Sequence, residues 1–312
     1  MAKIPTKTDS KKMKYPIYIV SKGRAKTPMT ANLFKKFGID FMIVVEPQEY
    51  QEYCDEIGKQ YVLELPFSNL GLGSYPARNF CWEHSIEQGY EKHWVFDDNI
   101  RNMRRVINGK RIPVNPGIAI QCTEDFIDRY QNVAIGAFNY YTFVVPGQSD
   151  KKPFNLNVHC YSAMLIDNNL PFRWRLKYNE DIDLCLQALH NNYATILINA
   201  FIIDKISTSQ KMSGGNQTEL YQNNAEDKKI LKARSLQEIW KNEGYVEVIK
   251  RYGRPHHWIE WKKHFNIPLI KKTNFDSTKI EKINNYGMEL KVIKPPKNKH
   301  LLNIVEQLNQ QR

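Results

Sequence analysis

Alternating hydrophobic periods in the first hundred residues constrain the fold of this chain more than any other feature. Short apolar, β-prone runs lie at residues 17–20, 41–45, 61–65 and 93–96. Segments with helical character separate them, at 28–37, 48–57 and 74–87. A glycine stands at or just beyond the end of each segment, as is common at helix C-termini. This β-α-β-α-β-α-β order predicts a parallel sheet with helices on its faces.

The rest of the chain has a more mixed pattern. Strands are expected at 133–145, 157–166 and 194–204, a helix at 179–189, and mainly helices from 220 to 265. The predicted architecture is therefore an α/β domain of residues 15–267, with a Rossmann-like, mostly parallel central sheet flanked by helices. A basic N-terminal tail (1–14) and a basic C-terminal appendage (268–312) complete the predicted organisation.

The positive charge of the chain is concentrated in its two ends. The net charge is +12. Residues 1–14 carry five lysines and one acid, a net of +4, and residues 271–312 carry nine cations and four acids, a net of +5. Basic ends suit a polyanion, either nucleic acid or an anionic membrane surface, although solubility explains them equally well.

Cysteine usage and hydropathy indicate an intracellular enzyme or binding protein. The five cysteines are scattered and form no C-x-x-C pair, so a disulfide framework or zinc knuckle is not expected. No apolar run is long enough to span a membrane, and the polar first 14 residues lack the apolar core of a secretory signal. We expect a cytoplasmic protein with no membrane partner.

In open α/β sheets, ligands bind beyond the carboxyl ends of the strands, so the residues that follow each strand matter most. Ser21–Arg24 follow the first predicted strand and Glu46 follows the second. Asp97 and Asp98 follow the fourth, where paired carboxylates suit Mg²⁺ or Mn²⁺ bound to a diphosphate. An ordinary turn is the alternative reading of these two acids.

A glycine-rich stretch, Gly71–Ser74, leads into the third predicted helix, with Ser74 as its expected N-cap. Such a helix start is a natural anion site, and Arg78 lies in the first turn, within reach of a phosphate. The stretch is neither a dinucleotide fingerprint, because Pro76 replaces the third glycine, nor a P-loop. A plain loop before a capped helix would have the same sequence pattern.

Two acids, Glu180 and Asp181, open the helix expected at 179–189. Either could accept the proton of an acceptor hydroxyl, although the helix dipole alone also favours acids at this position. The loop containing Ser213, Gly214, Gly215 and Asn216 could close over a donor, or could be an ordinary surface loop. His256, beside His257, could complete a metal site or be structural.

Together these motifs resemble those of GT-A glycosyltransferases and, more narrowly, of the TET/JBP-associated glycosyltransferases of bacteriophages. The motifs are Ile17–Arg24, Tyr75–Asn79, Val95–Ile100 and Asn179–Asp181. The Ser-Lys-Gly-Arg and Asp-Asp-Asn-Ile stretches are the most specific, and the resemblance covers about residues 15–260. It implies a GT-A-like fold, a UDP-sugar donor and a divalent metal, Mn²⁺ or Mg²⁺.

The resemblance also implies roles for individual residues. Ser21–Arg24 would hold the nucleoside, the two aspartates would form the D-x-D-type metal motif, and Glu180 and Asp181 would lie near the acceptor. Asn99 replaces the last acid of a strict D-x-D, which leaves open whether Asp97 or Asp98 binds the metal. The complete donor-binding prediction is Ser21, Lys22, Gly23, Arg24, Glu46, Arg78, Asn79, Asp97, Ser213, Gly214, Gly215 and Asn216. The predicted metal ligands are Asp98, Asp97 and His256.

The family resemblance implies a substrate as well: hydroxymethylated pyrimidines, such as 5-hydroxymethylcytosine, in phage DNA, which the sugar would protect from host nucleases. Asp181 or Glu180 would deprotonate the hydroxyl in an inverting reaction, and the lysine-rich ends would hold phosphates. Two alternatives remain: transfer to a surface glycan or lipid, and nonenzymatic binding of nucleic acid.

Overall fold

A computed structural model describes residues 13–107, 109–145, 147, 152–206, 214–215, 225–251 and 253–274. Most of the predicted basic tail and appendage, and two residues of the predicted donor loop, Ser213 and Asn216, lie outside these residues. The chain divides into two compact units, Met1–Lys272 and Thr273–Arg312. All the elements of the fold below belong to the first unit. No helix among the described residues has the length and apolar character needed to cross a membrane.

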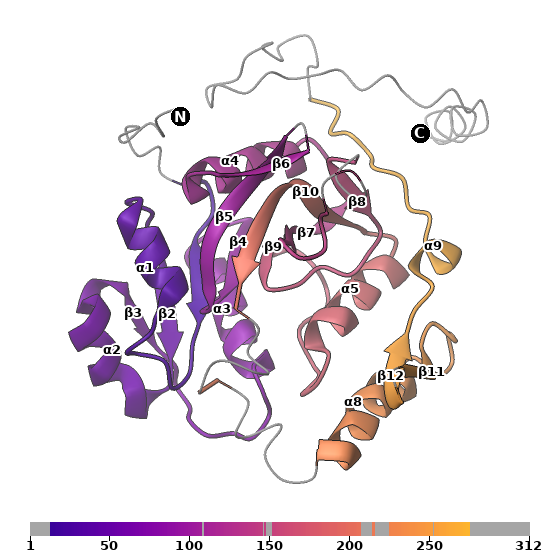
Figure 1. Cartoon of the computed structure of the whole chain (residues 1–312), viewed down its shortest axis with the longest axis horizontal. Helices are drawn as coiled ribbons and strands as arrows, with labels where there is room; N and C mark the ends of the chain where they lie inside the picture. The colour runs from indigo at the N-terminus through magenta and orange to yellow at the C-terminus, as the bar shows by residue number, and fades with distance from the viewer. Residues whose placement is uncertain are drawn as a thin grey trace. The chain divides into compact units, whose positions relative to one another are not determined.

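The first half of the fold follows the predicted alternation (Figure 1). The strands are β1 (Ile17–Val20), β2 (Met42–Val45), β3 (Val62–Glu64) and β4 (Lys92–Asp97). The helices between them are α1 (Met29–Lys36), α2 (Tyr50–Ile57) and α3 (Tyr75–Glu87). These strands pair in parallel in the order β3-β2-β1-β4. The prediction of a central sheet flanked by helices is confirmed.

The second half extends this sheet with both parallel and antiparallel pairs. Its strands are β7 (Val133–Tyr140), β8 (Phe154–Leu156), β9 (Ala163–Asp167) and β10 (Ala194–Lys205). The order continues from β4 through β9, β7 and β10 to β5 and β6, and β8 also pairs with β10. Because β9 runs against both β4 and β7, and β10 runs parallel to β7, strands β1, β4, β7 and β10 all end at one edge of the sheet.

Three elements between residues 100 and 127 were not predicted. They are β5 (Ile100–Ile107), β6 (Lys110–Pro113) and α4 (Pro116–Ile127). Strand β5 contains three arginines, and its apolar residues do not alternate with a period of two, so the usual strand signal is absent. β5 pairs with β6 as a hairpin and joins the sheet through β10.

The prediction that helices dominate residues 220–265 was only partly correct. Helices α8 (Ala225–Ile239) and α9 (Trp261–His264) are present, but between them along the chain lies a hairpin of β11 (Glu247–Arg251) and β12 (Arg254–Trp258). The turn of the hairpin contains Gly253 at φ +76°, a conformation that favours glycine. Leu236 of α8 and Trp240, just beyond the end of that helix, pack with residues of α5 (Glu180–His190) in a separate small core.

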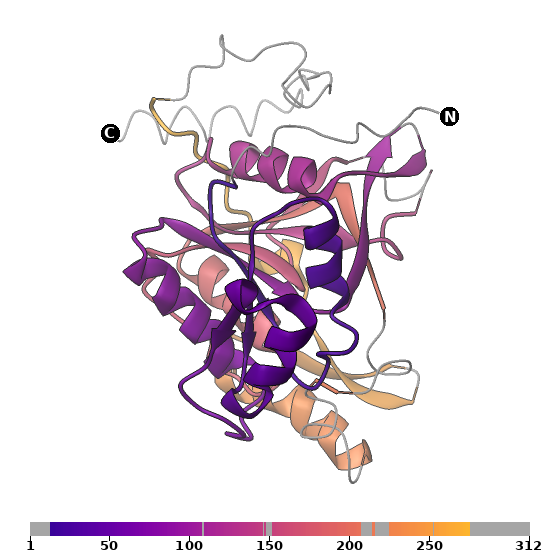
Figure 2. The ribbon, with the colours of Figure 1, turned by 90° about the vertical axis from the view of Figure 1, so that its left-hand side faces the viewer.

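Helices cover both faces of the sheet (Figures 1 and 2). On one face, Trp82 of α3 packs against His93 of β4, and residues of α5 join the same core. On the other face, Phe34 of α1 packs against Phe96, and Trp94 donates a hydrogen bond of 3.0 Å to Glu124 of α4. This three-layer packing fixes β4, and therefore fixes the two aspartates at its end.

Candidate active site at the carboxyl edge of the sheet

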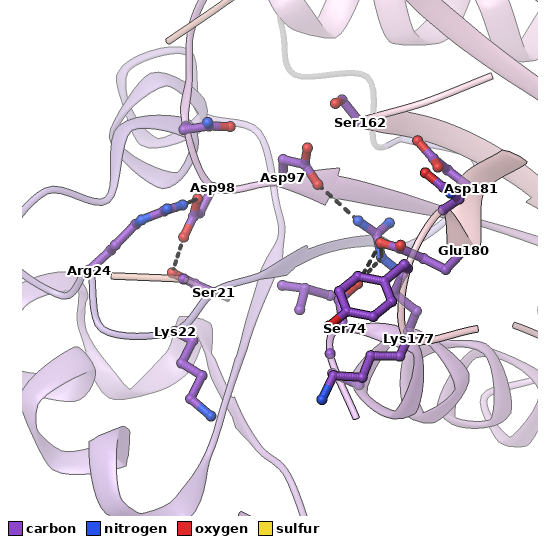
Figure 3. A pocket seen from close by; sticks show the side chains of 18 of the residues that line it. Ser21, Lys22, Arg24, Ser74, Asp97, Asp98, Ser162, Lys177, Glu180 and Asp181 are labelled. Atoms are coloured by element: carbon purple, nitrogen blue, oxygen red, sulfur yellow. Dashed lines mark hydrogen bonds and ion pairs between the residues drawn. The ribbon is translucent and has the colours of Figure 1, made fainter. Parts of the chain in front are cut away.

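A pocket of about 320 Å³ opens at the edge where β1, β4, β7 and β10 end. Residues that lie at or just beyond these four strand ends line it: Val20, Ser21, Asp97, Asp98, Tyr140 and Lys205. Glu180 and Asp181, at the start of α5, line it as well (Figure 3). Arg78 of α3 also lines the pocket. The structure therefore brings together three predicted features: the strand-end acids, the helix start that was expected to bind an anion, and the acidic pair.

Asp98 points away from the centre of the pocket into a buried polar cluster (Figure 3). Its carboxylate forms an ion pair with Arg24, and it accepts a hydrogen bond of 2.7 Å from Ser21 Oγ. The Asp98 residue is 4% exposed and the Arg24 side chain 6%. Burial raises the pKa of Asp98, while the charge of Arg24 opposes that shift. This pair fixes the Ser-Lys-Gly-Arg loop to the end of β4.

Asp97 faces the pocket and is held between two cations. Arg78 Nη2 donates to Oδ1 at 3.0 Å, and Lys205 Nζ pairs with Oδ2. Burial alone would raise the pKa of Asp97, but the charges of Lys205 and Arg78 outweigh it and lower the pKa to about 2. Asp97 is therefore a permanent carboxylate that organises two cations.

Arg78 connects the strand-end acids to the acidic pair of α5. Its guanidinium is buried, lies 4.8 Å from the ring of Trp174 and places Nε 3.8 Å from Glu180 Oε1. Its Nη1 is buried and has no hydrogen-bond partner among the described residues. Such an unpaired donor at a pocket wall suits an anionic group of a ligand.

Ser74 is the N-cap residue of α3, as predicted, but its side chain makes no capping hydrogen bond. Instead, Ser74 Oγ donates to Glu180 Oε1 at 2.8 Å and accepts from Arg78 Nε at 3.1 Å. The hydroxyl therefore joins α3 to α5 across the pocket instead of closing its own helix.

Glu180 and Asp181 lie in different electrostatic environments. Burial and the charge of Asp181 raise the pKa of Glu180, against the influence of Arg78. Burial would also raise the pKa of Asp181, but His159, whose Nε2 lies 3.1 Å from Oδ2, lowers it instead through its charge. The other Asp181 oxygen accepts the backbone N–H of Ile182 at 2.9 Å.

Lys22 and Glu46 lie at the far side of the pocket from the acidic pair. Lys22 Nζ donates to Glu46 Oε1 at 3.0 Å, and both residues line the pocket. Gly23 donates its backbone N–H to Glu49 Oε2 at 2.8 Å. These contacts order the loop after β1 and leave polar atoms of that loop on the pocket wall.

Gly214 and Gly215 rest directly on this loop. Gly215 donates its N–H to the Lys22 carbonyl at 2.7 Å, and Arg24 Nη2 donates to the Gly214 carbonyl at 3.2 Å. A Cβ at position 214 would lie 2.4 Å from the Gly23 carbonyl oxygen. The two glycines are therefore required for the close approach of chain segments that are almost two hundred residues apart.

Asn79 does not contribute to the pocket. Its side chain turns toward the backbone of Trp174, donating to the carbonyl at 2.8 Å and accepting from the N–H at 3.1 Å. The prediction that Asn79 binds the donor is therefore corrected. Successive residues of a helix point about 100° apart, and this rotation turns Asn79 toward Trp174 while Arg78 faces the pocket.

The described side chains do not fit a preformed divalent-metal site. No group of three or more His, Cys, Asp or Glu side chains within the described ranges is placed to hold a metal ion. Both oxygens of Asp98, and both of Asp97, are already engaged by cations or a hydroxyl. A hard cation would need these oxygens as ligands.

His256, the third predicted metal ligand, does not line this pocket. It lies in a second hollow, together with three cations, Lys232, Arg251 and Arg254. Burial, followed by the charges of Arg251 and Lys232, lowers the pKa of His256. Cationic neighbours disfavour a bound metal ion, so the predicted grouping of His256 with the aspartates is corrected.

Several pocket residues were not predicted from the sequence. Lys205 directly follows the strand expected at 194–204, so the rule applied to β1 and β4 would have found it. Tyr140 was hidden because the strand expected at 133–145 ends at residue 140. Ser162, whose Oγ accepts from Lys205 Nζ at 2.8 Å, lies before β9 at φ +59° and has no sequence signal. Lys177 and Lys232 add further positive charge to the lining.

Comparisons with known proteins relate the chain to a family of glycosyltransferases. The model of the family described as TET-Associated Glycosyltransferase matches residues 15–215. No curated protein matches the chain. Among solved structures, a candidate nucleotide-diphospho-sugar transferase from Desulfovibrio desulfuricans G20 is 11% identical, with a TM-score of 0.34 over 59% of this chain and 79% of that one.

Proposed function

Because the chain belongs to the TET-associated glycosyltransferase family, we propose that it transfers a sugar from a nucleotide-diphosphate sugar, a UDP-sugar in the first instance, to hydroxymethylated pyrimidines in DNA. The observation that carries this proposal is the meeting of Arg78, Lys205 and the acids of α5 in one pocket at the carboxyl edge of the sheet. Donor binding, leaving-group stabilisation and proton removal thereby have candidate groups within one pocket.

The cations of the pocket support a diphosphate-bearing donor. Negative charge develops on the departing nucleoside diphosphate, and fixed cations directed at that charge lower the barrier. Arg78, through its unpaired Nη1, and Lys205 are the groups we assign to this role. The loop Ser21–Arg24, closed by Gly214 and Gly215, is the proposed nucleoside site.

The acidic pair supports activation of an acceptor hydroxyl, which an inverting transfer requires. A carboxylate with a raised pKa is the stronger base in its ionised form, and neighbouring acids with divergent pKa values commonly have different roles. We therefore assign proton removal to Glu180. Asp181, held by His159 and the Ile182 N–H, positions the acceptor.

The acceptor is proposed from the family and from the charge of the chain. The proposed acceptor is hydroxymethylpyrimidine in phage DNA, which would be modified in the cytoplasm of the host. The excess of positive charge in the chain is consistent with binding to DNA. Extrusion of the base would bring its hydroxyl to the pocket. The sugar would then protect the DNA from host nucleases.

The test is transfer by the purified full chain. A panel of UDP-sugars is offered with duplex DNA that contains either cytosine or 5-hydroxymethylcytosine, and product mass is measured. A sugar-sized gain on the hydroxymethylated duplex alone supports both donor and acceptor. Donor hydrolysis without transfer to DNA would support the glycosyltransferase assignment and contradict DNA as the acceptor. No reaction with any donor contradicts the proposal.

Two additions make the assay specific for this pocket. Parallel reactions in EDTA, Mg²⁺ and Mn²⁺ decide the metal requirement: a divalent-metal enzyme loses activity in EDTA, whereas a donor site built from side-chain cations keeps it. Arg78→Met should lower turnover by roughly 10²–10³-fold. Arg173→Met is the matched control, because Arg173 also stacks on a tryptophan, 4.6 Å from the Trp82 ring, but does not line the pocket.

A further inference from the structure

The β5–β6 hairpin carries a concentration of positive charge that the functional assignments above do not use. Five cations and no acid lie between residues 100 and 113, and the next acid in the sequence is Glu124. Strand pairing places Val106 opposite Arg111 and Arg104 opposite Pro113. Side chains two apart on a strand share a face, so Arg104 and Arg111 lie on the same side of the hairpin.

Tyr141 orients these two arginines. The guanidinium carbons of Arg111 and Arg104 lie 3.8 Å and 5.3 Å from the centre of its ring. Arg111 Nη1 also donates to the Tyr141 carbonyl at 2.7 Å. No carboxylate in the described part of the chain pairs with either arginine, and Arg104 Nε is buried without a hydrogen-bond partner. The two charges are fixed in position and have no acidic partner among the described residues.

This charged face borders the active-site pocket. A third hollow, of about 360 Å³, is lined by Tyr140–Phe143 and Ile203–Lys205, and it shares Tyr140 and Lys205 with the active-site pocket. Phe143 is 58% exposed, and its ring lies 5.4 Å from that of Tyr140. Asp204 is the one acid among the described residues that line this hollow, and Arg101 pairs with it at 3.1 Å.

We propose that Arg104, Arg111, Tyr141 and Phe143, named here the Arg–Tyr ridge, form the docking surface for acceptor DNA. The arginines contact the phosphates beside the target nucleotide, and Phe143 stacks on a base next to the one that enters the pocket. Fixed cations beside an exposed aromatic ring are the combination that recognises a nucleic-acid backbone with an accessible base. This inference rests on the proposed function, and it assigns DNA binding to the ridge instead of the basic ends.

The test measures binding of the full chain to a fluorescent duplex containing 5-hydroxymethylcytosine, at several salt concentrations. Arg104→Gln/Arg111→Gln should weaken binding and reduce the slope of log K against log salt by up to about 1.8, because each phosphate contact contributes about 0.9. Lys36→Gln/Lys59→Gln is the matched control, since it removes two exposed lysines that line neither hollow. An unchanged slope in the arginine variant, or an equal loss in the control, overturns the proposal.

Phe143→Ala gives a second, independent test. The position is exposed, so the variant should fold, and losing a stacked base should lower DNA affinity about 5- to 150-fold without changing the salt slope. Affinity equal to that of the parent overturns the stacking role. Donor hydrolysis without DNA should be unchanged in all ridge variants. A parent that hydrolyses donor but binds no DNA overturns both the ridge and the DNA acceptor, whereas a parent that glycosylates DNA with unaffected ridge variants overturns the ridge alone.

Discussion

Replacing Asp98 with alanine tests whether this carboxylate is the structural partner of Arg24 or a ligand of a metal ion. The substitution would leave the guanidinium of Arg24, whose side chain is 6% exposed, without its counter-ion, and Ser21 Oγ without its acceptor. Removing one member of a buried ion pair costs about 3–5 kcal/mol. For a domain of this size each kcal/mol lowers the melting temperature by roughly 2–4 °C, so we expect a fall of about 6–20 °C.

The assay is thermal unfolding, combined with donor hydrolysis at a temperature at which the variant remains folded. Asp98→Asn keeps the size and an acceptor for Ser21 and should lose less stability than Asp98→Ala. Replacing Arg24 in the Asp98→Ala variant should lower the free energy of unfolding by less than the same replacement in the parent, because the ion pair is already broken.

A metal-ligand role for Asp98 predicts the opposite pattern. The melting temperature would then stay within about 2 °C of the parent, while donor hydrolysis would be lost and the parent would require a divalent ion. That result would refute the structural assignment of Asp98 and restore the sequence prediction.

Three further predictions follow from individual contacts. Gly214→Ala should weaken donor binding at least about tenfold, because the new Cβ would meet the Gly23 carbonyl. Gly244→Ala is the control, since Gly244 also has a positive φ but has open space around it, and this variant should bind donor normally. Equal KM values for the donor in the two variants would contradict the prediction. Lys205→Met should lower donor turnover roughly 10²–10³-fold in a hydrolysis assay, and parental turnover would remove it from the mechanism. Burial raises the pKa of Glu124 to about 7, so the fold favours the neutral, protonated side chain. The stability that Glu124 contributes in this form is fully present below about pH 4.5 and is lost as the pH rises through 7. Glu124→Gln should therefore be more stable than the parent at pH 8 by up to about 3 kcal/mol, but not at pH 4.5, and a difference independent of pH would argue against the shift.

The sequence was most informative where one strand or helix end places a residue. Asp97 and Asp98 follow an apolar run, and Glu180 opens a clear amphipathic helix, so their positions at the pocket were predictable. Their partners were not, because the pairing of Asp98 with Arg24 and of Asp97 with Lys205 depends on which strands are neighbours in the sheet. Local pattern cannot specify that order.

Two other differences have simple geometric causes. Asn79 follows Arg78 along α3, and the helical rotation between them decides which side chain reaches the pocket, a detail that a motif does not encode. The β5–β6 hairpin was missed because arginines interrupt its apolar pattern. Those same arginines are the reason to assign the hairpin a function.

The position of β10 in the sheet also determines the order in which the molecule can assemble during synthesis. Strand β5 has two partners, β6 beside it in sequence and β10, which leaves the ribosome about ninety residues later. Until then the basic hairpin has no place in the sheet and the pocket lacks Lys205. Contacts this distant in sequence form slowly, because a long loop must close first. A nascent chain that ends before residue 194 would therefore have the aspartates of the pocket without Lys205 or an attached β5–β6 hairpin, so the site can become complete only late in translation.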